Sequence, residues 1–221
     1  VIYIYIYIIM CYSAESSMLA FSLASFFSYK LFSRNKGHDR SIALVIFGIS
    51  TMQIAEFFMH LNNDCNSKLN KYSSILGLVV LLFIQPFFSI LSNYNTDKNI
   101  NSNKLFVHIL VWFIYLIYIY NNFWPKDNEL CTENVCNDCK LNWKWFKSSG
   151  DIISGILYSC VVLIIPLYVM HNKNKIKNKT MLWIIYIISS ILIVKFLNDK
   201  YFGTLWCFWG PLGAYLIQYY L

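Results

Sequence analysis

Charged residues are scarce in this sequence. They make up 13% of its 221 residues, against about a quarter in an ordinary soluble domain. This scarcity argues against a water-soluble globular protein. Hydrophobic residues make up 57% of the chain and the mean hydropathy is +0.48, which argues equally against a disordered chain. The composition predicts one polytopic membrane domain.

Histidine is also rare, with four residues and no repeated His-x-x-His pair. This argues against membrane hydrolases and desaturases that gather three or more histidines around a metal. His108 opens a helix at the opposite depth from His60, so the two cannot share one ion. The last apolar stretch contains no lysine that could carry retinal. We therefore predict no metal site and no cofactor.

Seven apolar stretches approach or exceed the roughly 20 residues that cross a bilayer. They cover residues 13–32, 41–61, 73–91, 105–120, 152–170, 181–196 and 203–221. The first is the weakest, because Glu15 and several serines dilute it. The sequence thus predicts an all-α integral membrane protein, a bundle of seven transmembrane helices.

The opening residues 1–9 alternate Ile or Val with Tyr and resemble no signal peptide. We expect Met10 to be the native start and residues 1–9 to be upstream sequence translated in frame. The alternative is a longer first helix. Residues 10–221 then form a single membrane domain with a cysteine-containing external loop at 121–151.

Lysine and arginine set the predicted orientation, because they favour cytosolic loops. The loops after the first, third and fifth stretches carry ten of them, and the loops on the other side carry seven, offset by acidic residues. We therefore place the N-terminus outside and the C-terminus in the cytosol. The net charge of +7 follows from these loops, and no contiguous basic face predicts nucleic-acid binding.

Four of the seven cysteines fall in loops on the predicted external side: Cys65, Cys131, Cys136 and Cys139. Oxidising compartments permit disulfides. We expect two bridges among these four, with three connectivities open. The competing interpretation is a metal knuckle made by the Cys-x4-Cys-x2-Cys run together with Cys65, but a zinc site of this kind normally repeats the Cys-x2-Cys pair.

Glu56 and His60 lie four residues apart in the second stretch and share a helix face, which Gln53 extends. Ionisable residues inside a membrane are costly and mark sites by default. Other polar or reactive residues occur at a similar depth, so the predicted pocket comprises Cys11, Ser13, Glu15, Gln53, Glu56, His60, Lys195, Trp206 and Cys207. The alternative is structural: Glu56 is protonated or paired with Lys195 and pins helices together.

Three of the four prolines fall inside predicted helices: Pro86, Pro166 and Pro211. A proline in a helix frees a backbone carbonyl, and neighbouring helices can supply a new donor to it. The resulting kinks can form a cavity or a gate, and the alternative is a purely structural use.

The residues from Met10 to Ser17, MCYSAESS, resemble the opening of an uncharacterised family of multi-helix membrane proteins from bacteria and large DNA viruses that begin Met-Cys-aromatic-Ser-Ala. The similarity continues through QIAEFF at 53–58, Pro86, KLNWKW at 140–145 and the closing stretch from Gly203. It supports Met10 as the start and draws attention to Cys11, Ser13, Glu56, Trp206 and Cys207. The family has no established activity, so the resemblance implies no reaction.

These patterns predict a multi-pass protein that binds or transports a small molecule, ion or lipid in an external-side pocket around Glu56 and His60. Two alternatives stay open. One is a membrane-embedded enzyme acting on lipids, with His60 as base and Glu56 orienting it, although no activated nucleophile accompanies the pair. The other is a structural protein of a cellular or viral membrane. The expected partners are the lipid bilayer and such a ligand; the oligomeric state is left open.

Overall fold

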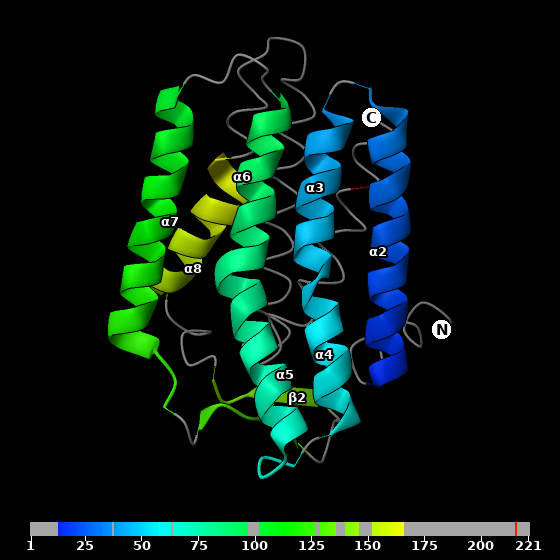
Figure 1. Ribbon diagram of the computed structural model, residues 1–221, viewed down its shortest axis with the longest axis vertical. Helices are drawn as coiled ribbons and strands as arrows, with labels where there is room; N and C mark the ends of the chain where they lie inside the picture. The colour runs from blue at the N-terminus through cyan, green and yellow to red at the C-terminus, as the bar shows by residue number, and fades with distance from the viewer. Residues whose placement is uncertain are drawn as a thin grey trace.

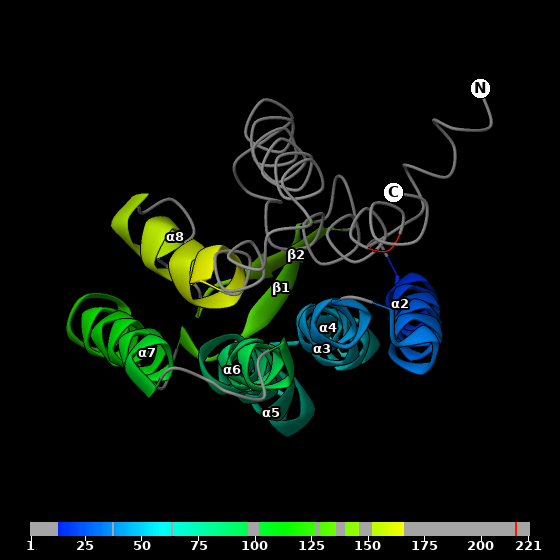
Figure 2. The same ribbon diagram turned by 90° about the horizontal axis from the view of Figure 1, so that it is seen from above.

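The computed structural model describes residues 13–36, 38–62, 64–96, 102–126, 129–135, 140–145, 152–165 and 215. Its helices are α2 (Ala14–Arg34), α3 (Asp39–Ser50), α4 (Met52–Leu61), α5 (Lys68–Val79), α6 (Gln85–Thr96), α7 (Ser102–Phe123) and α8 (Ile152–Ser159). The helix α4 continues α3, and α6 continues α5, so that α2, α3–α4, α5–α6 and α7 run alternately up and down the long axis of the molecule (Figure 1). Seen from above, α2, α3–α4, α5–α6 and α7 stand side by side in chain order, with α8 beside α7 (Figure 2).

Three helices in the described part of the chain are long and apolar enough to cross a membrane: Asp39–Leu61, Lys68–Tyr94 and Asn103–Phe123. They correspond to the second, third and fourth predicted stretches. The helix α2 is not among them, in line with its diluted composition. The fifth stretch begins as predicted at Ile152. The sixth and seventh stretches lie outside the described residues, apart from Tyr215.

The distribution of polarity in this bundle is the reverse of that in a soluble protein. Large apolar side chains point outward, most of all on α7, where Phe106, Val107, Leu110, Phe113, Ile114 and Ile117 are exposed. Serine, asparagine, glutamine and histidine side chains are buried between the helices. This arrangement suits a bilayer, where apolar surface faces lipid and polar groups find partners inside the bundle.

Small residues allow the helices to approach closely. The buried face of α2 carries Ser17, Ala20, Ala24 and Ser28, and the Ser28 hydroxyl donates a 2.6 Å hydrogen bond to the Ala43 carbonyl of α3. On the other side of α3, a Cβ atom at Gly48 would lie 2.7 Å from the Phe88 Cβ of α6. Small side chains at these positions therefore allow α2, α3 and α6 to pack closely.

Proline explains a π-helical turn, Val80–Ile84, between α5 and α6. Pro86 has no N–H to offer the Leu82 carbonyl four residues earlier, and its ring crowds that carbonyl. The indole N–H of Trp112 on α7 donates to the Leu82 carbonyl at 2.8 Å. A residue of the neighbouring helix thus satisfies the carbonyl that Pro86 frees.

A second π-helical turn, Cys160–Ile164, follows α8 and precedes Pro166 in the sequence. The carbonyl four residues before Pro166 belongs to Val162, and the Ser89 hydroxyl of α6 lies 3.2 Å from it and 2.8 Å from the Val161 carbonyl. His108 Nε2 lies 2.7 Å from the same Val161 carbonyl. Side chains of α6 and α7 thus form hydrogen bonds with the carbonyl groups that the π-helical turn leaves available.

The loop predicted at 121–151 contains an antiparallel hairpin that the sequence reasoning did not predict. Its strands are β1 (Thr132–Val135) and β2 (Lys140–Trp143), with Thr132 opposite Trp143. The hairpin lies across the lower end of the bundle in Figure 1, where α4 ends and α5 begins. We call this the hairpin end, and the end at which α2 meets α3 the opposite end.

Candidate functional site

Glu56 and Gln53 form a buried pair within α4. Both side chains are 0% exposed, and Gln53 Nε2 donates to Glu56 Oε2 at 2.7 Å. Their spacing of three residues puts them on one helix face. Glu56 lies about 8 Å along the helix axis from the end of α4, at 1.5 Å per residue. The Glu56 carboxylate thus lies inside the bundle, in the half near the hairpin end.

A slight irregularity in the helix precedes this pair. The Thr51 hydroxyl donates to the Gly48 carbonyl at 2.6 Å and the Ser50 hydroxyl donates to the Phe47 carbonyl at 2.8 Å. Hydroxyl groups that bond back to the preceding turn often bend a helix. The boundary between α3 and α4 falls at Thr51, so the Gln53–Glu56 pair sits in the first turns after it.

The antiparallel helix α2 brings a further buried hydroxyl to the same level. Ser28 contacts Ala43 near the opposite end, and Glu15 interacts electrostatically with His60 near the hairpin end. Ser17 lies between these two levels and is 0% exposed. Its Oγ, like Gln53 Oε1, has no hydrogen-bond partner among the described residues. Both are oxygen atoms that can accept.

The remaining predicted pocket residues divide into two groups. Ser13 is the N-cap of α2, where it exchanges hydrogen bonds with Ser16, and Glu15 is exposed beside it. His60 is half-buried in the last turn of α4. These residues therefore lie between the Gln53–Glu56 pair and the hairpin end. The other group lies outside the described residues: Cys11, Lys195, Trp206 and Cys207.

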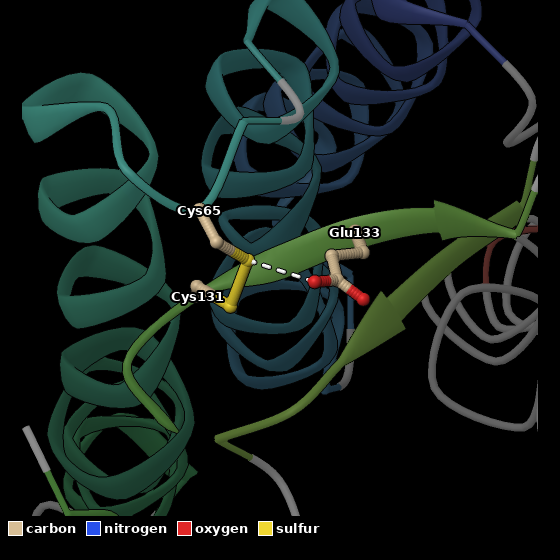
Figure 3. Close-up of side chains that lie close together, drawn as sticks. All are labelled: Cys65, Cys131 and Glu133. Atoms are coloured by element: carbon tan, nitrogen blue, oxygen red, sulfur yellow. Dashed lines mark hydrogen bonds between the residues drawn. A yellow bond between two sulfur atoms is a disulfide. The ribbon is translucent and has the colours of Figure 1, made fainter. Parts of the chain in front are cut away.

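A disulfide joins Cys65, in the loop between α4 and α5, to Cys131, just before β1. This is one of the pairings that the sequence left open. Cys136 and Cys139 lie outside the described residues. The Glu133 carboxylate of β1 faces the bridge, with Oε1 at 3.3 Å from Cys65 Sγ (Figure 3). The same oxygen accepts a hydrogen bond from the ammonium group of Lys144.

Cys65, Cys131 and Glu133 are also a cluster of metal-ligand types, with their ligand atoms within 4.8 Å of one another. A cysteine binds zinc as its thiolate, and here the two sulfur atoms are bonded to each other. The oxidised pair therefore does not fit a zinc site, and the disulfide interpretation describes this part of the loop.

A buried hydrogen-bond network that the sequence did not predict fastens the hairpin to α5. Asn70 Nδ2 donates to the Thr132 carbonyl at 2.6 Å, and the Thr132 N–H donates to Asn70 Oδ1 at 2.8 Å. The Thr132 hydroxyl also meets Ser74 Oγ at 3.0 Å and accepts from the Trp145 indole at 3.2 Å. The prediction begins this helix at residue 73 and leaves Asn70 in the loop; the observed helix begins at Lys68.

A second such group lies toward the opposite end. His108 is 0% exposed, and its Nδ1 lies 2.7 Å from Asn93 Nδ2. Because the amide nitrogen donates, Nδ1 accepts, and Nε2–H is left to donate to the Val161 carbonyl. This arrangement describes a neutral imidazole that holds α6, α7 and the turn after α8 together. In the sequence, the sign of this group was His108 itself, a histidine near the start of an apolar stretch.

Comparison of the sequence with protein-family models and curated proteins, and of the structure with solved structures, finds no match.

Proposed function

We propose that this chain is a multi-pass integral membrane protein that binds a small cation, a proton included, at Glu56. The observation that carries the proposal is the burial of the Glu56 carboxylate beside Gln53 inside an apolar helix long enough to cross a membrane. Intramembrane ionisable residues mark ion and proton pathways. A carboxylate sealed from water needs a positive charge or a proton to neutralise it.

Asp39 is a second buried carboxylate and provides a control for Glu56. Asp39 is also 0% exposed. Arg34 pairs with both of its oxygens, at 2.7 and 2.9 Å, and the Lys36 N–H donates to it at 2.9 Å. That carboxylate is a structural tie between α2 and α3.

The oxygen atoms near Glu56 suit a hard cation. Gln53 Oε1 and the Ser17 hydroxyl are buried acceptors without a partner among the described residues, and carboxylate, amide and hydroxyl oxygens are ligands of alkali and alkaline-earth ions. A bound cation would meet both the charge of Glu56 and these unused acceptors. We place transport second to binding, as the activity that follows if the site opens alternately to the two sides.

The orientation that we propose has seven spans, the hairpin end and N-terminus outside, and the C-terminus in the cytosol. Two observations support it. The Cys65–Cys131 disulfide lies at the hairpin end and fits an oxidising compartment. Lys30, Arg34, Lys36 and Arg40 gather at the opposite end, as short cytosolic loops require.

The experiment is thermal unfolding of the full-length protein in detergent with Li⁺, Na⁺, K⁺, Mg²⁺ or Ca²⁺ at constant ionic strength, repeated over pH. A ligand that binds only the folded state stabilises it by about 2.7 kcal/mol at one hundred times its Kd. We expect one cation, or protons, to raise the Tm of the wild type. Glu56→Gln should abolish that rise. Asp39→Asn, the matched buried carboxylate, should lower the baseline Tm but retain the rise.

The structural alternative predicts a different set of results. If Lys195 neutralises Glu56, Lys195→Met should lower the Tm strongly, and adding Glu56→Gln should recover part of the loss, because a buried charge is no longer left unpaired. That recovery, or a Tm insensitive to every cation and to pH in the wild type, would refute the cation site.

A further inference from the structure

The Cys65–Cys131 bridge has three properties that a purely structural cross-link does not need. Its two cysteine residues differ in exposure, its neighbourhood contains a carboxylate aimed at one sulfur, and the segments that it joins are also fastened to each other by other contacts. Each property has its own residues, and each bears on whether the bridge can open and close in the folded protein.

The first property is asymmetry. Cys131 is 3% exposed, whereas Cys65, in the loop after α4, is half-buried. Thiol–disulfide exchange requires a thiolate to approach one sulfur, and accessibility decides which sulfur it reaches. An incoming thiolate can therefore reach Cys65 and leave Cys131 as the departing group.

The second property is the position of Glu133. Its Oε1 lies 3.3 Å from Cys65 Sγ (Figure 3), a distance suited to an S–H···O hydrogen bond. A disulfide sulfur has no proton to donate, so the oxidised pair makes no use of this acceptor. After reduction, the Cys65 thiol can donate to Glu133. The carboxylate thus favours the reduced state, and Lys144, bound to the same oxygen, helps to hold it in this orientation.

The third property is redundancy of attachment. Asn70 holds Thr132 by two hydrogen bonds at 2.6 and 2.8 Å, one residue after Cys131. Trp145 packs into the space above Gly77, where its Cζ2 atom would lie 2.8 Å from a Cβ. The hairpin therefore stays docked when the bridge is open, and the two thiols remain close enough to close it again.

We propose that Cys65–Cys131 is a thiol–disulfide exchange site that accepts electrons from a dithiol, with Glu133 as the hydrogen-bond acceptor for the reduced Cys65. One thiolate of the dithiol attacks Cys65 Sγ, the sulfur–sulfur bond breaks, and its electron pair leaves on Cys131 Sγ, which takes a proton from water. The second thiolate of the dithiol then attacks its own mixed-disulfide sulfur and releases Cys65, which also takes a proton. The dithiol loses two electrons and two protons, and the cysteine pair gains them.

The test uses the folded full-length protein in detergent, equilibrated without denaturant in buffers of reduced and oxidised dithiothreitol. Free and bridged cysteines are labelled with light and heavy alkylating reagents and assigned by mass spectrometry. We expect the Cys65–Cys131 pair to be reduced and reoxidised reversibly. Glu133→Gln should lower its reduced-to-oxidised ratio about threefold at fixed buffer, because a neutral amide oxygen is the weaker acceptor. Glu129→Gln, an acidic residue of the same segment, should leave the ratio unchanged.

Two results would overturn the proposal. One is a bridge that resists reduction in the folded protein and opens only in denaturant, which is the behaviour of a structural cross-link. The other comes from the wild type alone and does not depend on the folding of a variant: brief exposure to glutathione should give a mixed disulfide on Cys65, and a mixed disulfide on Cys131 instead would contradict the assigned order of attack.

Discussion

The attachment of the hairpin to α5 depends on one side chain, which makes Asn70→Ala a stringent test of the structure. The substitution removes the donor to the Thr132 carbonyl and the acceptor for the Thr132 N–H. It also removes the donor to the Asn62 carbonyl, 2.8 Å away. Because Asn70 and Thr132 are 0% exposed, water cannot readily replace these bonds.

The magnitude follows from the groups left behind. A net hydrogen bond contributes about 1 kcal/mol, and a buried backbone group without a partner costs about 1–3 kcal/mol. With two backbone groups of Thr132 orphaned, we expect the hairpin to be held about 3 kcal/mol less tightly. An amide that exchanges by local opening then exchanges about a hundredfold faster, at 1.4 kcal/mol per factor of ten.

The assay is hydrogen–deuterium exchange of the oxidised full-length protein, followed at peptides that contain Thr132. Asn66→Ala is the matched control, because Asn66 is an exposed asparagine in the neighbouring loop, and it should leave the exchange unchanged. Ser74→Ala removes a hydroxyl partner of Thr132 and a long hydrogen bond of 3.4 Å to Asn70 Oδ1, leaves both hydrogen bonds between Asn70 and the Thr132 backbone in place, and should have a small effect. Exchange in Asn70→Ala within about threefold of wild type would refute the assignment of Asn70 as the anchor.

Two further predictions concern close packing and the proline-associated turn. Gly77→Ala should lower the free energy of unfolding by about 1–3 kcal/mol, because the new Cβ would lie 2.6 Å from Met59 Cε and 2.8 Å from Trp145 Cζ2; an unchanged Tm would show that these side chains move aside freely. Trp112→Phe keeps the ring packing but removes the indole donor to the Leu82 carbonyl, and should cost about 1 kcal/mol in a denaturant titration; a loss no larger than the measurement error would show that the carbonyl finds another donor.

Much of the helical organisation was predictable, because hydrocarbon imposes a simple rule. A segment that crosses the bilayer must satisfy its backbone internally and expose apolar side chains, so hydropathy and length locate helices well. The spans Asp39–Leu61, Lys68–Tyr94 and Asn103–Phe123 match predicted stretches. Boundaries were less accurate: α5 begins at Lys68. Asn70, in its first turn, is buried by hydrogen bonding with Thr132, and hydropathy alone assigns such a residue to a loop.

The candidate site was predictable in part for the same reason. Glu56 and Gln53 share a helix face however the helices pack, because residues three positions apart lie on the same side of a helix. That both are fully buried, and that Ser17 of α2 reaches their level, depends on how α2 and α4 pack, which the pattern of a single helix does not contain.

The sequence by itself determined the helical class, the positions at which prolines free carbonyls, and the presence of a carboxylate inside an apolar segment. Each of these follows from the chemistry of neighbouring residues along the chain. Only the tertiary structure decided that Cys131 pairs with Cys65, that Asn70 holds Thr132, and that Trp112 and His108 supply donors to the freed carbonyls. These contacts join residues 30 to 66 positions apart, and several pairings satisfy the local chemistry equally well until the helices are packed.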